Sequence, residues 1–182
     1  MKNIIEKLKR LEQESISRGI PIVGSEKGMF LLSKVQEIKP KKILELGTAN
    51  GYSGCILGSE AAELITIDID EQISLEAEKN FQKFGIHAHR IIGEAVEEVK
   101  KLILDKQNLE SFDLIFIDFS KKEYIKVLED CIKLVRKDGL IIADNITFEG
   151  CQNYREKVLN HPKLKTEIID IKDGLACSKR IK

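Results

Sequence analysis

Short apolar runs alternate with longer amphipathic stretches from Lys42 onward. Each run is bounded by Gly, Asp or Asn, a pattern that is typical of strands buried in a parallel sheet. We expect such strands at five places: 43–47, 64–68, 89–92, 114–118 and 139–144. The other stretches carry apolar side chains at helical spacing, and they predict helices over residues 53–61, 71–84, 94–106, 121–136 and 151–160.

Two more helices are expected ahead of the first strand. The first covers residues 4–16 and aligns one stripe of side chains: Ile4, Leu8, Leu11 and Ser15. The second covers residues 25–38 and places four apolar side chains at helical spacing: Met29, Leu32, Val35 and Ile38. The stripe of the first helix could cover either the core or a partner subunit.

The repeated alternation of strand and helix predicts the fold class. Parallel neighbours need crossover connections, so the pattern implies a parallel sheet with helices on both faces. At the end of the chain, runs 165–171 and 175–179 are joined by Lys172-Asp173-Gly174, which predicts a hairpin. We therefore expect an α/β, Rossmann-like doubly wound sheet of seven strands, mostly parallel with the last strand antiparallel. Because domains average roughly 150 residues, the 182 residues form one domain, with helices over 1–40 and the sheet core over 41–182.

Composition excludes several classes of protein. Thirty basic and thirty acidic side chains cancel, which disfavours indiscriminate nucleic-acid binding. The charge is nevertheless segregated, because residues 43–120 carry 6 basic and 15 acidic side chains between two basic ends. The four cysteines include no C-x-x-C pair, which argues against a zinc knuckle. No apolar run approaches the roughly 20 residues of a membrane span, and we expect a cytoplasmic protein with no membrane partner.

The turn after the first predicted strand offers a cofactor site. Gly47 and Gly51 form a G-x-x-x-G pattern ahead of a helix, which suits a carboxylate better than a pyrophosphate. Asp68 ends the second strand 21 residues after Gly47, where related folds bind ribose hydroxyls. Glu94 follows the third strand, at the place of an adenine edge. Each signal has a structural alternative, since a glycine turn can serve folding alone and Asp68 could cap the next helix. Together they resemble the S-adenosylmethionine-dependent methyltransferases, whose motifs read like ILELGTANGYSG and TIDID.

Acidic and amide side chains end the fourth and fifth predicted strands. Asp118 ends one strand, and Asp144 with Asn145 ends the next. In a doubly wound sheet these tips can be adjacent, and three hard oxygen donors suit Mg²⁺ or a similar divalent cation. The alternative is that the two aspartates cap helices and Asn145 forms a turn.

From about Pro21 to Gly174 the sequence resembles the catechol/caffeoyl-coenzyme A O-methyltransferase family. The resemblance implies that Asp118, Asp144 and Asn145 hold the divalent metal and that Lys121 is the general base. It also matches Glu167 to an acid that contacts the substrate hydroxyl. The residues it implies for S-adenosylmethionine binding are Val23, Glu45, Gly47, Tyr52, Ser53, Asp68, Glu94, Ala95 and Asp118.

The sequence departs from the catechol enzymes where bulky apolar residues wall the substrate ring. Gly19, Ser120 and Glu149 occupy these positions, which predicts a more open and polar acceptor site. We expect a metal-dependent O-methyltransferase that acts on the hydroxyl of a small molecule, as a homodimer. Two alternatives stay open: methylation of hydroxyuridine at the wobble position of tRNA, and a non-catalytic protein that only binds S-adenosylmethionine.

Overall fold

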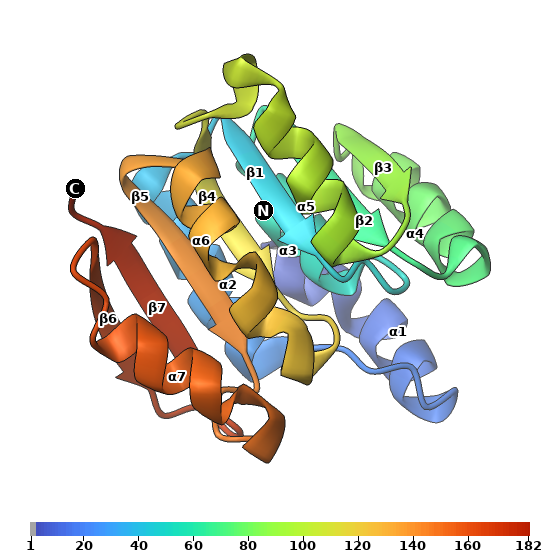
Figure 1. Cartoon of the computed structure of the whole chain (residues 1–182). Coiled ribbons are helices and arrows are strands. Elements are labelled where there is room, and N and C mark those ends of the chain that lie inside the picture. The colour runs from blue at the N-terminus through green and yellow to red at the C-terminus, as the bar shows by residue number, and fades with distance from the viewer. Residues whose placement is uncertain (1–2) are drawn as a thin grey trace.

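A seven-stranded sheet with helices on both faces forms the molecule in the computed structural model, which describes residues 3–182 (Figure 1). The strand order is β3-β2-β1-β4-β5-β7-β6. Six strands share one direction, and β7 runs antiparallel to its neighbours β5 and β6. This confirms the predicted fold class. The strands are β1 (Lys42–Leu46), β2 (Glu63–Asp68), β3 (Ala88–Ile92), β4 (Phe112–Ile117), β5 (Val135–Asp144), β6 (Leu164–Ile169) and β7 (Leu175–Arg180).

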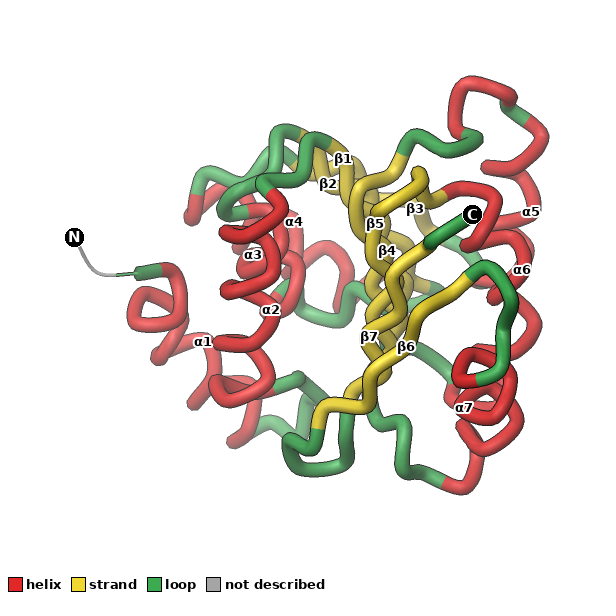
Figure 2. The backbone as a smooth tube through the Cα atoms, turned by 90° about the vertical axis from the view of Figure 1, so that its left-hand side faces the viewer, coloured by secondary structure: helices red, strands yellow, loops and turns green. Residues whose placement is uncertain are grey.

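The helices form two layers, one on each side of the sheet (Figure 2). One layer holds α1 (Ile4–Ser17), α2 (Gly24–Ile38), α3 (Tyr52–Gly58) and α4 (Glu71–Phe84). The other holds α5 (Ala95–Leu104), α6 (Tyr124–Leu134) and α7 (Gln152–Leu159). Short 3-10 turns at Lys106–Asn108, Lys121–Glu123 and Glu149–Cys151 connect some of these elements.

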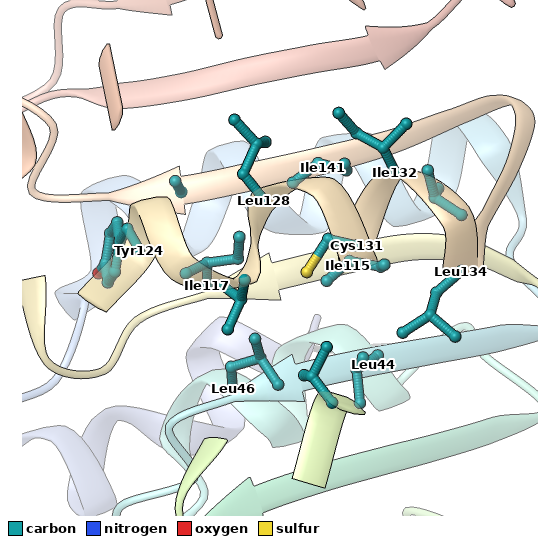
Figure 3. Close-up of a cluster of buried hydrophobic side chains, with 14 of the residues drawn as sticks. Leu44, Leu46, Ile115, Ile117, Tyr124, Leu128, Cys131, Ile132, Leu134 and Ile141 are labelled. Carbon is teal, nitrogen blue, oxygen red and sulfur yellow. The ribbon is translucent and has the colours of Figure 1, made fainter. Parts of the chain in front are cut away.

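The central strands β1, β2 and β4 are buried on both faces, as expected for parallel strands between two helical layers. Figure 3 shows one of the two cores, where Leu128, Cys131 and Ile132 of α6 lie over the strands. Branched side chains of the strands, among them Ile115 and Ile117, fill the space below and are fully buried. This packing fixes the strand tips that carry the polar residues of the site.

The first helical layer confirms one predicted stripe and corrects the other. Ile4, Leu8 and Leu11 of α1 are buried, so this stripe packs on the hydrophobic core of the same chain. Met29 of α2, expected on the apolar face, is instead 48% exposed. The buried face of α2 runs through Leu31, Leu32 and Val35, because α2 packs against both α1 and α3.

The end of α6 also differs from the expectation. We predicted a helix to residue 136 and a strand from 139, but α6 ends at Leu134 and β5 begins at Val135 with no intervening loop. Two long-range contacts explain the early strand. The Val135 carbonyl accepts a hydrogen bond from Nη1 of Arg180 at 2.6 Å, and Nε of Arg136 lies 2.5 Å from Oδ1 of Asp113.

The register brings three strand ends together. Leu46 of β1 pairs with Ile117 of β4, and Ile117 pairs with Ala143 of β5. The turns after these strands therefore begin at the same edge of the sheet. Within residues 3–182, no helix is both long enough and apolar enough to cross a bilayer.

Candidate functional site

A cavity of about 570 Å³ opens at the carboxyl ends of β1, β2 and β4. This is the edge where open α/β sheets bind their ligands, and the volume suits a bound cofactor. Residues from five segments line it: 19–22, 47–53, 67–73, 93–95 and 118–123. The cavity thus joins the predicted cofactor turn to the predicted reaction residues.

Gly47 lets the cofactor turn pass directly over the tip of β4. Its φ is 103°, and a Cβ atom there would lie 2.0 Å from the carbonyl oxygen of Asp118. No side chain fits at that distance, so glycine is required both by the backbone conformation and by the close approach. Backbone bonds from Gly47 to Ile67 and from Asp118 to Leu46 hold the three strand ends together.

Asp68 organises this turn. Its Oδ2 accepts the backbone N–H groups of Thr48 and Ala49, both at 2.8 Å, and its Oδ1 accepts that of Asp70 at 2.9 Å. The alternative that Asp68 caps the following helix is wrong, because the N-cap of α4 is Asp70. Asp68 lines the cavity, so the same carboxylate shapes the turn and faces the bound molecule.

Glu45 lies beneath the turn and is fully buried. Its carboxyl accepts hydrogen bonds from the hydroxyls of Ser53 and Thr66, each at 2.7 Å. Burial raises the pKa of Glu45 to about 8, and the negative charges of Asp118 and Asp68 add to this, although the two hydroxyls oppose it. Glu45 does not line the cavity, so its contact with a cofactor would run through Ser53, which does.

At the tip of β4, Asp118 and Lys121 form a close pair. Nζ of Lys121 lies 2.5 Å from Oδ1 of Asp118 and donates to the hydroxyl of Tyr124 at 3.0 Å. Both charged side chains are partly exposed to the cavity, whereas Tyr124 is buried below them. The ammonium is therefore held at the cavity wall by one carboxylate and one phenol.

At the tip of β5, Asp144 is almost completely buried, at 2% exposure. Its Oδ1 accepts hydrogen bonds from Nζ of Lys27 and from the backbone N–H of Asn145. Burial and the nearby charge of Asp118 raise the pKa of Asp144 to about 6, although Lys27 opposes this. Asp118 and Asp144 directly follow Ile117 and Ala143, which pair with each other in the sheet.

Three oxygen atoms at these tips fit a divalent cation. Within residues 3–182, Oδ2 of Asp118, Oδ2 of Asp144 and Oδ1 of Asn145 accept no hydrogen bond, whereas the other polar atom of each side chain has a partner. Two carboxylates and an amide oxygen are hard donors, which Mg²⁺ prefers. No group of three or more His, Cys, Asp or Glu side chains in the described part of the chain could hold a metal ion. A cation bound by Asp118 and Asp144 would therefore need the amide oxygen of Asn145 as its third ligand.

Most of the predicted cofactor residues meet at the cavity. Its lining includes Gly47, Tyr52, Ser53, Asp68, Glu94, Ala95 and Asp118, together with the predicted base Lys121. Val23 is buried just before α2 and, like Glu45, is absent from the lining, although its neighbour Ile22 contributes to it. Gly19 and Ser120, two of the three positions expected to open the acceptor site, also line the cavity.

Glu167 lies apart from this group. Glu167 pairs with Cys177 of β7, which in turn pairs with Ile142 of β5, two residues before Asp144. The side chain of Glu167 is exposed. Glu167 is not among the residues that line the cavity. The structure thus gives Glu167 no place beside Lys121, and its catalytic role stays a prediction from resemblance.

Sequence reasoning missed Lys27 and Asp173. Lys27 is 2% exposed and binds both Asp144 and Asp173, while the other oxygen of Asp173 accepts from the amide of Asn145. Burial lowers the pKa of Lys27, but its hydrogen bonds to the two carboxylates outweigh this and raise it. One signal was available, since Lys27 stands four residues before Leu31 and eight before Val35, on the buried stripe of α2.

Comparison with known proteins gives a match over the whole sequence. A family model described as O-methyltransferase matches residues 1–182. The chain belongs to this O-methyltransferase family. Its predicted resemblance is thereby confirmed at the level of the family.

Individual relatives agree with this assignment. The chain is 34% identical to catechol O-methyltransferase B of Danio rerio over 79% of this chain and 57% of that protein. It is 31% identical to caffeoyl-CoA O-methyltransferase 1 of Zea mays over 70% of this chain and 51% of that protein. The chain therefore spans little more than half the length of these curated relatives. An O-methyltransferase structure from Bacillus cereus in complex with SAH has the same fold, with a TM-score of 0.85, 22% identity, and coverage of 99% of this chain and 92% of that one.

Proposed function

We propose that the chain is an S-adenosylmethionine-dependent O-methyltransferase that uses Mg²⁺ or a similar divalent cation and methylates a hydroxyl group of a small molecule. One observation carries the proposal. The cavity beside Gly47 and Asp68 is continuous with the Asp118–Lys121 pair, and the free oxygens of Asp144 and Asn145 follow on the adjacent strand. A methyl donor and a hydroxyl acceptor bound at this edge would be neighbours.

The cofactor end of the cavity matches the polar groups of S-adenosylmethionine. Ser53 and the backbone before α2 would bind its carboxylate, and Asp68 would bind its ribose. Glu94 and Ala95 stand where the adenine edge would lie. This assignment rests on family membership and on the position of these residues in the cavity wall. The acidic character of the wall also suits a sulfonium cation.

Asp118, Asp144 and Asn145 would hold the divalent cation. When bound, such a cation makes a ligated hydroxyl more acidic and stabilises the developing oxyanion. Asp144 is kept in place by its buried contacts, and Asp118 is anchored at the end of β4. Positioning of the nucleophile close to the methyl group supplies much of the rate in such reactions.

Lys121 would accept the hydroxyl proton at Nζ, which requires that the ammonium has first released the proton by which it binds Asp118. The hydroxyl oxygen then forms a bond to the methyl carbon, the carbon–sulfur bond breaks, and the sulfur keeps the electron pair. The products are the methyl ether and S-adenosylhomocysteine. Asp118 and Tyr124, which both contact Nζ of Lys121, aim the amine at the cavity.

The acceptor side supports a polar small molecule. Gly19 and Ser120 line the wall without a bulky apolar side chain, and Glu149 follows β5 at the start of a 3-10 turn. Ile20, Ile22 and Phe119 still supply apolar surface to the same cavity. A homodimer stays a prediction from the resemblance.

Calorimetry with S-adenosylmethionine, with and without Mg²⁺, followed by methyl transfer from labelled cofactor to a panel of hydroxyl compounds, tests the proposal. We expect cofactor binding, and transfer that stops when a chelator removes the divalent cation. Absence of cofactor binding would refute the proposal. Transfer that persists under the chelator would refute only the role of the cation.

The two alternatives predict different results in the same assay. Bulk tRNA that carries hydroxyuridine is added as one further acceptor. Transfer to tRNA alone would replace the small-molecule acceptor with RNA. Cofactor binding with no transfer to any acceptor would favour the non-catalytic protein.

A further inference from the structure

A buried lysine joins the start of α2 to two distant carboxylates. Nζ of Lys27 binds Oδ1 of Asp144 at the tip of β5 and Oδ1 of Asp173 in the β6–β7 turn. The lysine is 2% exposed and Asp144 is 3% exposed in its side chain. A buried ammonium needs such partners, because an unpaired charge in this position would cost several kcal/mol.

Asp173 is fixed from two sides. Its Oδ1 accepts from Lys27, and its Oδ2 accepts from Nδ2 of Asn145. Its backbone carbonyl accepts from both the N–H and the hydroxyl of Thr147, at 3.1 and 2.9 Å. The β6–β7 turn is therefore bonded to the segment that follows β5, and the Asp173 side chain has no freedom to turn away.

This arrangement determines which atom Asn145 presents. Its amide nitrogen is committed to Asp173, so the amide oxygen is the atom left without a hydrogen bond within residues 3–182. A metal ligand usually depends on such a neighbour for its orientation. Asn145 also has a φ of 55°, which lies in the left-handed region that residues other than glycine rarely adopt. The surrounding structure therefore holds its backbone in this conformation.

We propose that Asp173 and Lys27 are positioning residues of the cation site: Asp173 orients the oxygen of Asn145, and Lys27 locks Asp173 to Asp144. This inference rests on the proposed function, because it assigns both residues to the divalent cation that the reaction uses. Neither residue contacts the cation itself.

Electrostatic attraction alone predicts a different outcome. Asp173 contributes a negative charge and Lys27 a positive one. If only the local field mattered, removal of Asp173 would weaken cation binding and removal of Lys27 would strengthen it. If positioning dominates, both removals weaken binding, although they change the charge in opposite directions.

The experiment measures Mn²⁺ and Mg²⁺ affinity by calorimetry with S-adenosylhomocysteine at saturation. The variants are Asp173→Ala and Lys27→Met, with Lys100→Met as the control that removes an exposed ion pair on α5. We expect each of the two site variants to bind the cation about tenfold or more weakly, and the control to match the wild type. Tighter binding by Lys27→Met, or wild-type affinity in both site variants, would overturn the inference.

Lys27→Met is used only if it folds, and its affinity for S-adenosylhomocysteine without metal reports whether it does. If it does not fold, a second pair of variants still tests the proposal. Asp173→Asn and Asp173→Ala lose the same charge, but only Asp173→Asn keeps an oxygen for the amide of Asn145. Tighter cation binding by Asp173→Asn than by Asp173→Ala supports the positioning role, and equal affinity overturns it. If the wild-type protein binds the cofactor but no cation, the cation-dependent part of the proposed function fails too. If the wild type binds the cation and the variants bind it equally well, only the positioning role fails.

Discussion

The α-carbon of Gly47 faces the carbonyl of Asp118 so closely that a Cβ atom would lie 2.0 Å from that oxygen. The cofactor turn and the reaction tip therefore touch through their backbones, with no side chain between them. A substitution that moves the backbone of either residue would therefore displace the other one as well.

Substitution Gly47→Ala should therefore destabilise the protein and weaken cofactor binding. The positive φ alone costs about 1–3 kcal/mol of unfolding free energy, and the clash with the Asp118 carbonyl adds to this cost. Urea unfolding and calorimetry with S-adenosylhomocysteine measure the two effects. Gly85→Ala is the matched control, because Gly85 has a φ of 70° but open space around it. Equal losses in the two variants would show that the contact with Asp118 contributes nothing.

Substitution Lys121→Met should lower turnover and leave cofactor affinity unchanged. Loss of a positioned general base typically costs a factor of about 100 or more in rate. Steady-state kinetics on any acceptor found in the panel give kcat, and calorimetry gives the cofactor affinity. The neighbouring Lys122→Met, which removes an exposed lysine, should keep the wild-type kcat. A Lys121→Met variant with unchanged kcat would exclude this residue as the base.

Glu45 should make the protein less stable as the pH rises. Its pKa is about 8 in the folded protein and about 4.5 in the unfolded chain, so between these values the folded state holds a proton that the unfolded state releases. The free energy of unfolding then falls with pH across this window, by up to about 1.4 kcal/mol per pH unit from this group. Glu45→Gln, which cannot ionise, should remove that part of the slope. Denaturant unfolding at pH 5, 6 and 7.5 compares the two proteins, and parallel pH profiles would contradict the assignment.

Substitution Asp68→Ala should weaken cofactor binding about tenfold or more, because it frees two backbone N–H groups of the turn from a charged acceptor. Calorimetry with S-adenosylhomocysteine measures this. Asp113→Ala is the control, since Asp113 accepts the N–H groups of Lys41 and Lys42 at the opposite edge of the sheet. That variant should lose stability but keep its cofactor affinity. If both variants bind the cofactor alike, Asp68 serves only the fold.

The fold class and the polar residues at the strand ends could be predicted from the sequence because both follow from local patterns. Each apolar run ends in a polar residue, and parallel strands present their carboxyl ends at one edge. Asp118 and Asp144 could therefore be found from the sequence pattern, whereas Lys121 came from the family resemblance. Glu45 was harder, because a strand buried on both faces gives no sign of which side its one acid faces.

Lys27 and Asp173 could not be predicted in the same way. Their contact joins residues 146 positions apart, and neither position has a local pattern that names its partner. The role of Glu167 stays a prediction from the resemblance, and its pairing with Cys177 places it two residues before the end of β6.

The hydrogen bonds that Asp173 accepts from Lys27 and Asn145 also make the candidate cation site depend on the last hairpin of the sheet. The cofactor turn, complete by Ser53, can form once β1, β2 and β4 have paired, but Asn145 gains its partner only when the β6–β7 hairpin folds back. The cavity for the methyl donor and the orientation of Asn145 therefore depend on different parts of the chain, so damage to the β6–β7 turn would disturb acceptor activation before it disturbs cofactor binding.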